Sequence, residues 1–441
     1  MTRHLFGTDG VRGRAGEFLG ADLALSLARA ATVLCESEHP QVLIVRDTRE
    51  SGEMLESAIA AGITSAGGDA LIGGILPTPA APLLLRRHGL DLAAVISASH
   101  NPYEDNGIKL FAADGFKLSD DTEHEIEAEL DQPVPATARI GRVRRLHGAL
   151  EDYLRELHTR FSSLDLSGRR VLLDTANGAT FRAAPEIMRR LGAEVTVIAD
   201  DPDGRNINDG CGSTHLEGLV ERMRGDGHDI GFAFDGDGDR MLAVDRDGVI
   251  VDGDELIAIA ALHLRAADRL PGNGVVVTVM TNYGFHTAMG QAGVDIATTA
   301  VGDRYVLDEL RRRGWALGGE QSGHVIELGF GPSGDGIASA LLTLEALGDR
   351  DLSERDAMEK LPQRLVNIRA PDRAALTAAM EDPAVREAID REQAELSGRG
   401  RVLVRPSGTE PLVRVMVEAP SAEETDAVCG RLVELVELTI G

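Results

Sequence analysis

The sequence predicts an α/β protein built from three related α/β repeats and a smaller C-terminal α+β domain. Short apolar strands alternate with helical stretches along most of the chain, which is typical of layered α/β architecture. Three of these strands, Val42–Thr48, Val171–Thr175 and Val275–Thr281, end in a polar turn. Each is followed by a helical segment, another strand and a distinctive loop. The simplest interpretation is three copies of one repeat, each contributing a loop to a shared site.

The length and composition agree with this organisation. The chain has 441 residues, enough for three or four domains of roughly 100–200 residues each. Hydrophobic residues make up 43% and aromatic residues only 3%, so we expect cores made of Ala, Val, Leu and Ile. The formal charge of −27 makes nucleic acid and anionic membranes poor partners. An anionic substrate would therefore need a locally basic pocket.

The expected location is the cytoplasm. Cys35, Cys211 and Cys429 are far apart and form no CxxC motif, which is typical of reduced thiols in a cytosolic protein. The first residues are polar and glycine-rich, so no signal peptide is expected. No apolar run approaches the ~18 residues that a membrane span needs.

Four domains are predicted along the chain. Asp131–Pro135 follows a charged helix and closes the first domain, residues 1–150; a helix near Leu150–Phe161 opens the second, residues 151–252. A hairpin and the start of a helix over Asp245–Asp254 open the third, residues 253–362. In the fourth, residues 363–441, helices at Arg373–Met380 and Glu423–Leu438 flank strands at Arg401–Arg405 and Val413–Glu418.

The first distinctive loop presents a serine at a strand end. The strand Leu92–Ile96 leads into Ser97–Pro102, where Pro102 blocks a helical continuation and Ser99 precedes His100. Such a loop exposes a hydroxyl for phosphoryl or acyl chemistry, although the same residues also make a good turn. Lys109 follows shortly afterwards. It either lies close to Ser99 or is an ordinary surface lysine.

The second loop carries three carboxylates. Asp235, Asp237 and Asp239 alternate with glycines after the strand Ile230–Phe234. They offer only oxygen ligands, which favours Mg²⁺ with one position open for a phosphate oxygen. An EF-hand is excluded because Arg240 and Arg246 stand where Gly and Glu are required. A simple Asp-Gly turn is the weaker alternative, because repeated unpaired carboxylates repel one another.

The third loop, Gly318–His324, offers polar groups of the kind that bind sugar hydroxyls. Glu320, Ser322 and His324 provide donors and acceptors, and glycines allow close approach. A solvated hairpin turn explains this segment equally well.

Two further segments are candidates for phosphate binding. In Arg405–Pro411 the backbone N–H groups of Ser407–Thr409, two hydroxyls and an arginine suit a phosphate nest, the alternative being a plain Pro/Gly connection. It is no Walker loop, since GxxxxGK[ST] is missing from the sequence. In Phe6–Gly13 glycines flank Arg12, which either reaches a phosphate or belongs to a frayed terminus.

Taken together, these segments resemble the α-D-phosphohexomutase family from Phe6 to about Glu418, with four motifs in the family's order. The resemblance implies four domains around a central cleft. Four details indicate the branch that acts on glucosamine phosphates: Phe6–Gly13, Tyr103–Lys109, Val301–Val306 and Gln321. Members acting on mannose or glucose phosphates usually carry Met in place of Gln321. Ser333 departs from the family's usual Thr but keeps a hydroxyl.

The resemblance also implies roles for particular residues. Ser99 is expected to be phosphorylated and, with Asp235, Asp237 and Asp239, to ligate one Mg²⁺ per subunit. His100, Lys109 and Arg240 are expected to surround the transferring phosphoryl group, with His324 as general base. The expected substrate-binding residues are Arg12, Glu320, Ser322, Arg405, Ser407, Gly408 and Thr409.

The implied reaction interconverts glucosamine 6-phosphate and glucosamine 1-phosphate, a step toward UDP-N-acetylglucosamine and cell-wall precursors. A 1,6-bisphosphate would be the intermediate and the activator. The alternatives are a mutase for mannose or glucose phosphates and a non-catalytic phosphosugar-binding protein, which would be expected to lack Ser99 or one of the aspartates. Related enzymes are often dimers, so a homodimer is one expectation.

Overall fold

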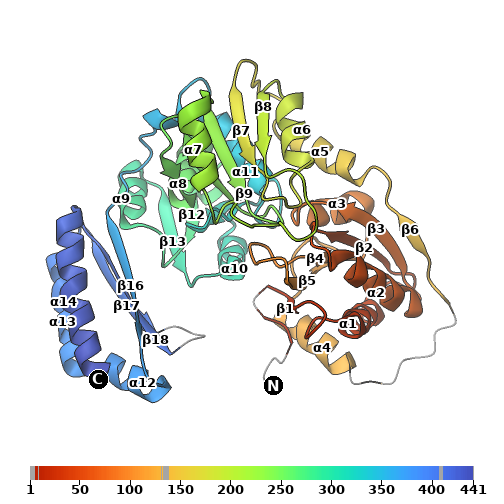
Figure 1. Cartoon of the computed structure of the whole chain (residues 1–441), viewed down its shortest axis with the longest axis horizontal. Helices are drawn as coiled ribbons and strands as arrows, with labels where there is room; N and C mark the ends of the chain where they lie inside the picture. Colours follow the sequence, from red (N-terminus) through yellow and green to blue (C-terminus); the bar gives the residue numbers. More distant parts are fainter. Residues whose placement is uncertain (1–4, 8, 131, 133–138, 407–410, 441) are drawn as a thin grey trace. The chain divides into compact units, whose positions relative to one another are not determined.

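The computed structural model describes residues 5–7, 9–130, 132, 139–406 and 411–440. The chain forms two compact units (Figure 1). The first contains Met1–Val279 and Ala297–Arg355, and the second contains Met280–Ile296 and Asp356–Gly441.

The first repeat is a six-stranded sheet in the order β1-β5-β4-β2-β3-β6. Helices α1 and α2 pack on each other and cover one face, and α3 lies on the other (Figure 1). Strand β4 is buried along its whole length, as expected for a strand inside a sheet covered on both faces. The strands are β1 Val11–Arg14, β2 Gln41–Arg46, β3 Asp69–Ile75, β4 Leu92–Ile96, β5 Asp105–Ala112 and β6 Val143–Arg145; the helices are α1 Ala21–Val33, α2 Gly52–Ser65, α3 Ala80–His88 and α4 Asp120–Leu130.

The second repeat is a five-stranded sheet in the order β11-β10-β9-β7-β8. Its strands are β7 Arg170–Asp174, β8 Glu194–Ile198, β9 Ile230–Phe234, β10 Met241–Asp245 and β11 Ile250–Val251; its helices are α5 Ala149–Arg160, α6 Ala183–Arg190 and α7 Glu217–Asp226. Strand β9 is apolar and buried throughout, so the loop that follows it starts from a rigid position.

The third repeat is a four-stranded sheet in the order β13-β12-β14-β15. Its first helix, α8, begins with a capping box, in which Asp252 accepts from the backbone N–H groups of Asp254 and Glu255. The strands are β12 Gly274–Thr278, β13 Asp295–Thr299, β14 Leu317–Gly319 and β15 Val325–Glu327; the helices are α8 Gly253–Ala266, α9 Tyr283–Ala292, α10 Asp303–Arg313 and α11 Gly336–Leu347, with short 3-10 turns η1 Pro271–Asn273 and η2 Leu352–Glu354.

All three sheets share one strand order, which confirms the repeat. In the first sheet the neighbouring strands are β3, β2, β4 and β5, in that order. The same order is seen in the second sheet, with β8, β7, β9 and β10, and in the third, with β13, β12, β14 and β15. The last strand of each set runs antiparallel to its neighbour. The three distinctive loops therefore occupy the same position, between the third and fourth strands. Each repeat is longer than the sequence predicts. Two helices and two strands, rather than one of each, lie between the first predicted strand of a repeat (β2, β7 or β12) and its loop.

The core of the first repeat is almost entirely aliphatic. Leu27, Ile44, Ile59 and Ile96 are fully buried in one cluster, with many alanines beside them. Burying one such side chain stabilises the fold by roughly 1.5–3 kcal/mol, so a core with few aromatic residues is sufficient.

The second compact unit contains the C-terminal domain, an antiparallel sheet in the order β16-β18-β17 with helices packed against it. Its strands are β16 Gln363–Arg369, β17 Arg401–Pro406 and β18 Leu412–Glu418; its helices are α12 Arg373–Glu381, α13 Pro383–Glu395 and α14 Ala422–Ile440. Strand β16 and helix α13 are additions to the sequence prediction. Helix α13 starts with Pro383 after the N-cap Asp382, a common helix start. With this domain the predicted fold class is confirmed.

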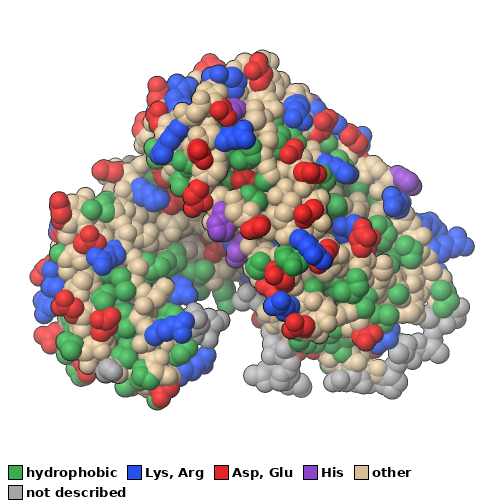
Figure 2. All heavy atoms as spheres, viewed as in Figure 1, with side chains coloured by type: hydrophobic (Ala, Val, Ile, Leu, Met, Phe, Trp, Pro, Cys, Tyr) green, Lys and Arg blue, Asp and Glu red, His purple; other side chains and the backbone are tan. Residues whose placement is uncertain are grey.

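Acidic and basic side chains are interspersed on the face shown in Figure 2, despite the net charge of −27. Within the described part of the chain, no helix combines the length and the apolar character needed to cross a membrane.

Candidate functional site

Ser99 lies just beyond the buried end of β4, in a backbone conformation that serine rarely adopts. Its φ is +54°, in the left-handed region that costs a non-glycine residue of order 1 kcal/mol or more. Hydrogen bonds hold it there: the Ser99 N–H donates to Ser97 Oγ (2.9 Å), and the Ser97 hydroxyl donates to Asp47 Oδ2 (2.6 Å). The surrounding structure thus fixes the direction of the Ser99 hydroxyl.

Two buried side chains from outside the loop hold its carbonyl groups. Arg49 Nη2 donates to the carbonyl oxygens of Ser99 (3.0 Å) and Asn101 (2.8 Å), and Asn208 Nδ2 donates to the same two oxygens at 3.0 Å each. Arg49 is itself anchored by Asp47, with 2.8 Å between Arg49 Nε and Asp47 Oδ2. Asn208 belongs to the second repeat, so the serine loop is fixed from two repeats.

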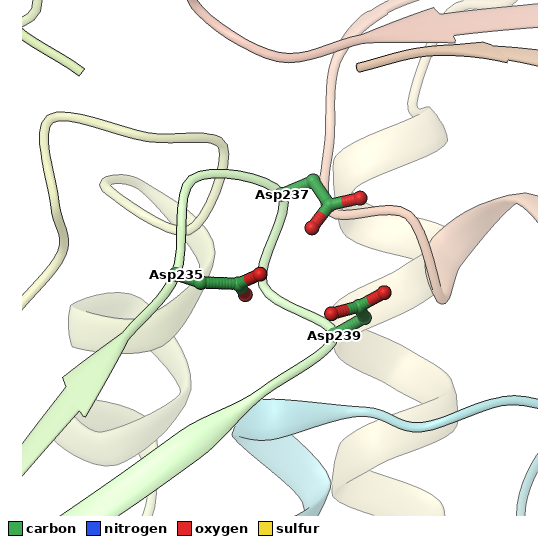
Figure 3. A group of neighbouring side chains, drawn as sticks. All are labelled: Asp235, Asp237 and Asp239. Carbon is green, nitrogen blue, oxygen red and sulfur yellow. The ribbon is translucent and has the colours of Figure 1, made fainter. Parts of the chain in front are cut away.

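The carboxylates of Asp235, Asp237 and Asp239 point toward one common space (Figure 3). One ligand oxygen from each lies within 4.8 Å of the others, and all three residues are buried. The Ser99 hydroxyl donates to Asp235 Oδ2 at 2.6 Å. The serine loop of the first repeat and the aspartate loop of the second therefore meet.

The close approach of these two loops requires a glycine between the aspartates. A Cβ on Gly236 would lie 2.6 Å from the Ser99 carbonyl oxygen and 2.8 Å from Asn208 Nδ2. The alternation of Asp and Gly in the sequence therefore has a steric cause at this position.

The surroundings of the triad shift the pKa values of Asp235 and Asp239 in opposite directions. Burial, together with the negative charges of Asp239 and Asp237, raises the pKa of Asp235 well above its usual range. Burial alone would also raise the pKa of Asp239, but Lys109 and the His324 imidazole hold it well below the usual range. Neighbouring carboxylates whose pKa values differ in this way repel each other when both are charged, so a cation between them would be strongly favoured.

Lys109 is fully buried and neutralises part of this charge. Its Nζ lies 2.9 Å from Asp237 Oδ2, 3.0 Å from Asp9 Oδ2 and 3.5 Å from Asp239 Oδ2. Burial would lower the pKa of Lys109, but these three carboxylates raise it, so the ammonium stays charged. Lys109 thus lies at the aspartate triad and is no surface lysine.

A second lysine extends the charge network toward the third repeat. Lys117 pairs with Asp9 and lies 2.5 Å from Asp303 Oδ2. Asp9 also pairs with Arg12.

Arg12 and Arg240 each keep a buried Nε–H for which the described residues provide no hydrogen-bond acceptor. Both guanidinium groups therefore have a donor available for an anion.

His100 lies between Ser99 and Arg240. Its Nδ1 is 3.4 Å from Ser99 Oγ and 3.2 Å from Arg240 Nη1. Burial, together with Arg240 and Arg12, lowers the pKa of His100, so this imidazole is neutral near pH 7.

The loop of the third repeat is tied to its neighbours by its polar side chains. Glu320 Oε1 accepts from the Gly302 N–H (2.9 Å), and Gln321 Nε2 donates to Asp252 Oδ2 (3.1 Å). Ser322 is exposed and His324 is buried. The loop thus presents Ser322 outward while Gln321 is held at the cap of α8.

The imidazole of His324 lies between two carboxylates. Its Nδ1 is 3.7 Å from Asp239 Oδ1, and its Nε2 is 3.8 Å from Asp303 Oδ2. Burial would lower the pKa of His324, but Asp239, Asp303 and Glu320 raise it overall. His324 therefore connects the loop Gly318–His324, the predicted sugar-binding loop (hereafter the sugar loop), to the aspartate triad.

A cavity of about 290 Å³ opens beside His324. It is lined on one side by Lys117 and neighbouring residues of the first repeat and on the other by Asp303 and helix α10. Its size is near the lower end for small-ligand pockets.

In the second compact unit, Arg405 lies opposite Arg414 in the β17–β18 pair. Burial and the charge of Arg414 lower the pKa of Arg405, and Arg414 Nε is buried without an acceptor among the described residues. Two like charges facing each other destabilise a strand pair unless an anion joins them. The predicted residues Ser407, Gly408 and Thr409 lie outside the described residues.

Several residues of the site are missing from the sequence-based prediction. Asp9 lies inside the predicted segment Phe6–Gly13, and Asp303 lies inside Val301–Val306, so the sequence indicates the neighbourhood of both. Lys117 is one of only three lysines, and that rarity was its only signal. The sequence offers no local signal for Arg49 or Asn208.

Comparison with known proteins identifies the family. Four family models match in order: phosphoglucomutase/phosphomannomutase alpha/beta/alpha domains I, II and III over residues 3–135, 151–248 and 252–365, and the C-terminal domain over 365–435. The phosphoglucosamine mutase of Desulforudis audaxviator is 50% identical over 442 residues, covering 98% of this chain and 97% of that protein. The chain belongs to the α-D-phosphohexomutase family. The phosphoglucosamine mutase of Saccharopolyspora erythraea is also 50% identical, covering 98% of each chain.

Solved structures share the phosphohexomutase fold. A phosphoglucomutase/phosphomannomutase family protein from Burkholderia thailandensis superposes with a TM-score of 0.80 at 23% identity, covering 98% of this chain and 97% of that one. The N-acetylphosphoglucosamine mutase of Aspergillus fumigatus, solved with GlcNAc-6P and magnesium, superposes with a TM-score of 0.68 at 19% identity, covering 100% and 96%.

Proposed function

We propose that this phosphohexomutase interconverts glucosamine 6-phosphate and glucosamine 1-phosphate through a phosphorylated Ser99 and a 1,6-bisphosphate. The observation that carries the proposal is the 2.6 Å hydrogen bond from the Ser99 hydroxyl to Asp235, which joins a nucleophile to a cation site. The relatives that are about 50% identical over the whole chain are phosphoglucosamine mutases, which supports the choice of substrate.

The residues of the triad fit Mg²⁺. Oδ1 of Asp237 and Oδ1 of Asp239 are buried and have no hydrogen-bond partner among the described residues, whereas their Oδ2 atoms bind Lys109. Mg²⁺ prefers such oxygen ligands and usually completes its shell with water and phosphate. We infer that Asp235, Asp237, Asp239 and phosphorylated Ser99 would hold it. The ion would neutralise charge on the transferring phosphoryl group.

The surrounding cations suit a phosphoryl transfer in both directions. In the forward step the Ser99 Oγ–P bond breaks and the phosphorus bonds to the oxygen on C1 of glucosamine 6-phosphate. His324, placed on the sugar loop, takes the proton of that hydroxyl as general base. His100 Nδ1 lies beside Ser99 Oγ, Arg240 contacts His100, and Lys109 contacts Asp237 of the triad. The cations Lys109 and Arg240 would stabilise the charge that develops on the phosphoryl group, with His100 between Ser99 and Arg240.

The bisphosphate then turns over, and its 6-phosphate returns to Ser99 as glucosamine 1-phosphate leaves. Glu320 and Ser322 would bind sugar hydroxyls in both orientations. Arg12 would contact phosphate through its available Nε–H. The 1,6-bisphosphate would also act as activator, because it can phosphorylate a free Ser99.

The distal phosphate needs a site away from Ser99, and the C-terminal domain offers one. Arg405 and Arg414 face each other on β17 and β18, and the predicted phosphate-binding residues Ser407, Gly408 and Thr409 follow β17 in the sequence. Bidentate contacts from arginine are well suited to phosphate. We also propose the division into domains 1–150, 151–252, 253–362 and 363–441, which the ranges of the four family models support.

A mutase for mannose or glucose phosphates would use the same machinery. We expect kcat/KM to be highest for glucosamine phosphates when all three sugars are compared. Ser99→Ala should abolish turnover of each, and Ser57→Ala, an exposed helical serine on α2, should leave it unchanged. Near-normal turnover by Ser99→Ala would refute the phosphoserine mechanism, and a clear preference for mannose or glucose phosphate would refute the substrate assignment.

A further inference from the structure

Asp303 is a partly buried carboxylate beside the sugar loop, and the proposed mechanism gives it no role. It is the first residue of α10 and lies within Val301–Val306. Its side chain is 20% exposed and lines the cavity of about 290 Å³. A charged carboxylate therefore lies at the wall of a cavity next to the sugar loop.

The position of Asp303 is coupled to that of the sugar loop. The N–H of Gly302, the preceding residue, donates to Glu320 Oε1 at 2.9 Å. Asp303 Oδ2 lies 3.8 Å from His324 Nε2, at the other end of the same loop. A sugar that contacts Glu320 and presents a hydroxyl to His324 therefore has Asp303 as its neighbour.

Asp303 has acceptor capacity left for a ligand. A carboxylate accepts about four hydrogen bonds. Oδ1 of Asp303 accepts from the Arg304 N–H (2.8 Å), and Oδ2 accepts from Lys117 (2.5 Å). Burial would raise the pKa of Asp303, but Lys117 and His324 lower it overall, so the group is ionised near neutral pH.

The substrate carries a group that matches this carboxylate. Glucosamine phosphates differ from glucose phosphates in having an ammonium group at C2, next to the C1 oxygen that His324 would deprotonate. We propose that Asp303 binds the 2-ammonium group of glucosamine 6-phosphate and so selects it over neutral hexose phosphates; this inference rests on the proposed function. A charge-assisted hydrogen bond of this kind adds affinity only for the amino sugar.

A purely structural role is the alternative, since Asp303 also pairs with Lys117. The two roles differ in their effect on a neutral sugar. Loss of a structural ion pair weakens binding of both sugars, whereas loss of an ammonium contact weakens binding of the amino sugar alone.

The test measures binding without chemistry, in the full-length Ser99→Ala protein. Dissociation constants for glucosamine 6-phosphate and glucose 6-phosphate are determined by calorimetry at pH 7, with and without Asp303→Asn. We expect the constant for glucosamine 6-phosphate to rise roughly ten- to hundredfold and that for glucose 6-phosphate to change less than about threefold. Asp303→Glu, which keeps the charge, should retain part of the discrimination.

Glu309→Gln is the matched control, because Glu309 is a carboxylate on the same helix that pairs with Arg312 and Arg313 and does not line the cavity. It should change neither constant. Lys117→Met removes the ion pair and should not reproduce the selective loss. If Asp303→Asn does not fold, Asp303→Ser replaces it.

Equal weakening for both sugars, or none for either, would overturn the role of Asp303 and leave the proposed function intact. Failure of the Ser99→Ala protein to bind any of these phosphosugars would instead refute the proposed function and, with it, this inference.

Discussion

Gly236→Ala tests directly whether the contact between the serine and aspartate loops is needed for catalysis. The added Cβ would lie 2.6 Å from the Ser99 carbonyl oxygen, 2.8 Å from Asn208 Nδ2 and 2.8 Å from Ile207 Cδ1. Ordinary contact begins at 3.4 Å, so the loops would have to separate by about 0.8 Å to restore it. Overpacking of this kind costs about 1–3 kcal/mol of stability.

The catalytic effect should exceed the effect on stability. A displacement of about 1 Å can reduce phosphoryl transfer about 100-fold, and here it separates Ser99 from Asp235, which are joined by a 2.6 Å hydrogen bond. The assay is single-turnover transfer from phosphorylated Ser99 to glucosamine 6-phosphate, with a denaturant melt of the same sample.

Gly225→Ala is the control substitution. Gly225 lies in α7, and its added Cβ would meet nothing within 4 Å, so it should stabilise the helix by up to about 1 kcal/mol and leave kcat unchanged. A folded Gly236→Ala protein with kcat within about threefold of the wild type would show that the loop contact does not matter.

Three further predictions concern the cation site, the sugar loop and the pH dependence of stability. Asp237→Asn should weaken activation by Mg²⁺ at least about tenfold; an unchanged Mg²⁺ titration would remove Asp237 from the site. Gln321→Glu places a second carboxylate beside Asp252, so KM for glucosamine 6-phosphate should rise several-fold, and Asp252→Asn in the same chain should restore it; failure of that rescue would mean that the pair does not position the loop. Burial raises the pKa of Asp335 to about 6. The stabilisation that comes from its protonated form is therefore complete below the unfolded-state pKa of about 4 and is lost as pH rises through 6. This group should make the free energy of unfolding about 1.4 kcal/mol smaller at pH 7 than at pH 5. In Asp335→Asn, which keeps the helix cap and the contact to Tyr153, denaturant midpoints should lose that part of the pH dependence, and an identical pH profile would show that the buried carboxylate does not titrate there.

The fold was largely predictable because its information is local. Strands such as Leu92–Ile96 and Ile230–Phe234 are continuous apolar runs bounded by turn residues, and the structure confirms both with the same ends. The weak repeat became visible for the same reason. Strand β16 and helix α13 were overlooked: β16 carries four exposed residues without a regular apolar alternation, and α13 buries only three of its residues.

The residues that organise the site were harder to predict because their partners are distant in sequence. Arg49 contacts carbonyls about fifty residues away, and Asn208 contacts carbonyls about a hundred residues away. Asp303 and Lys117 meet across 186 residues. Such pairs form only when the repeats pack together, and a single sequence does not show which residues of two repeats come into contact. The loops themselves could be found because each combines glycines with several polar groups of one chemistry.

The shared strand order explains why three loops lie at equivalent positions. Each loop connects the third strand of its repeat to the antiparallel fourth strand. Duplication of one repeat therefore places a serine, an aspartate triad and a sugar loop at matching sheet ends, and divergence of the loop alone changes the chemistry, as is common where function lies on loops above a rigid scaffold.

The most direct test of the central claim follows a phosphoryl group onto Ser99. The protein is incubated with Mg²⁺ and glucosamine 1-phosphate carrying an isotopically labelled phosphate, and the labelled peptide is identified by mass spectrometry. We expect one labelled phosphate per chain, located on Ser99, and none in Ser99→Ala. Steady turnover with no label on Ser99 would contradict the claim.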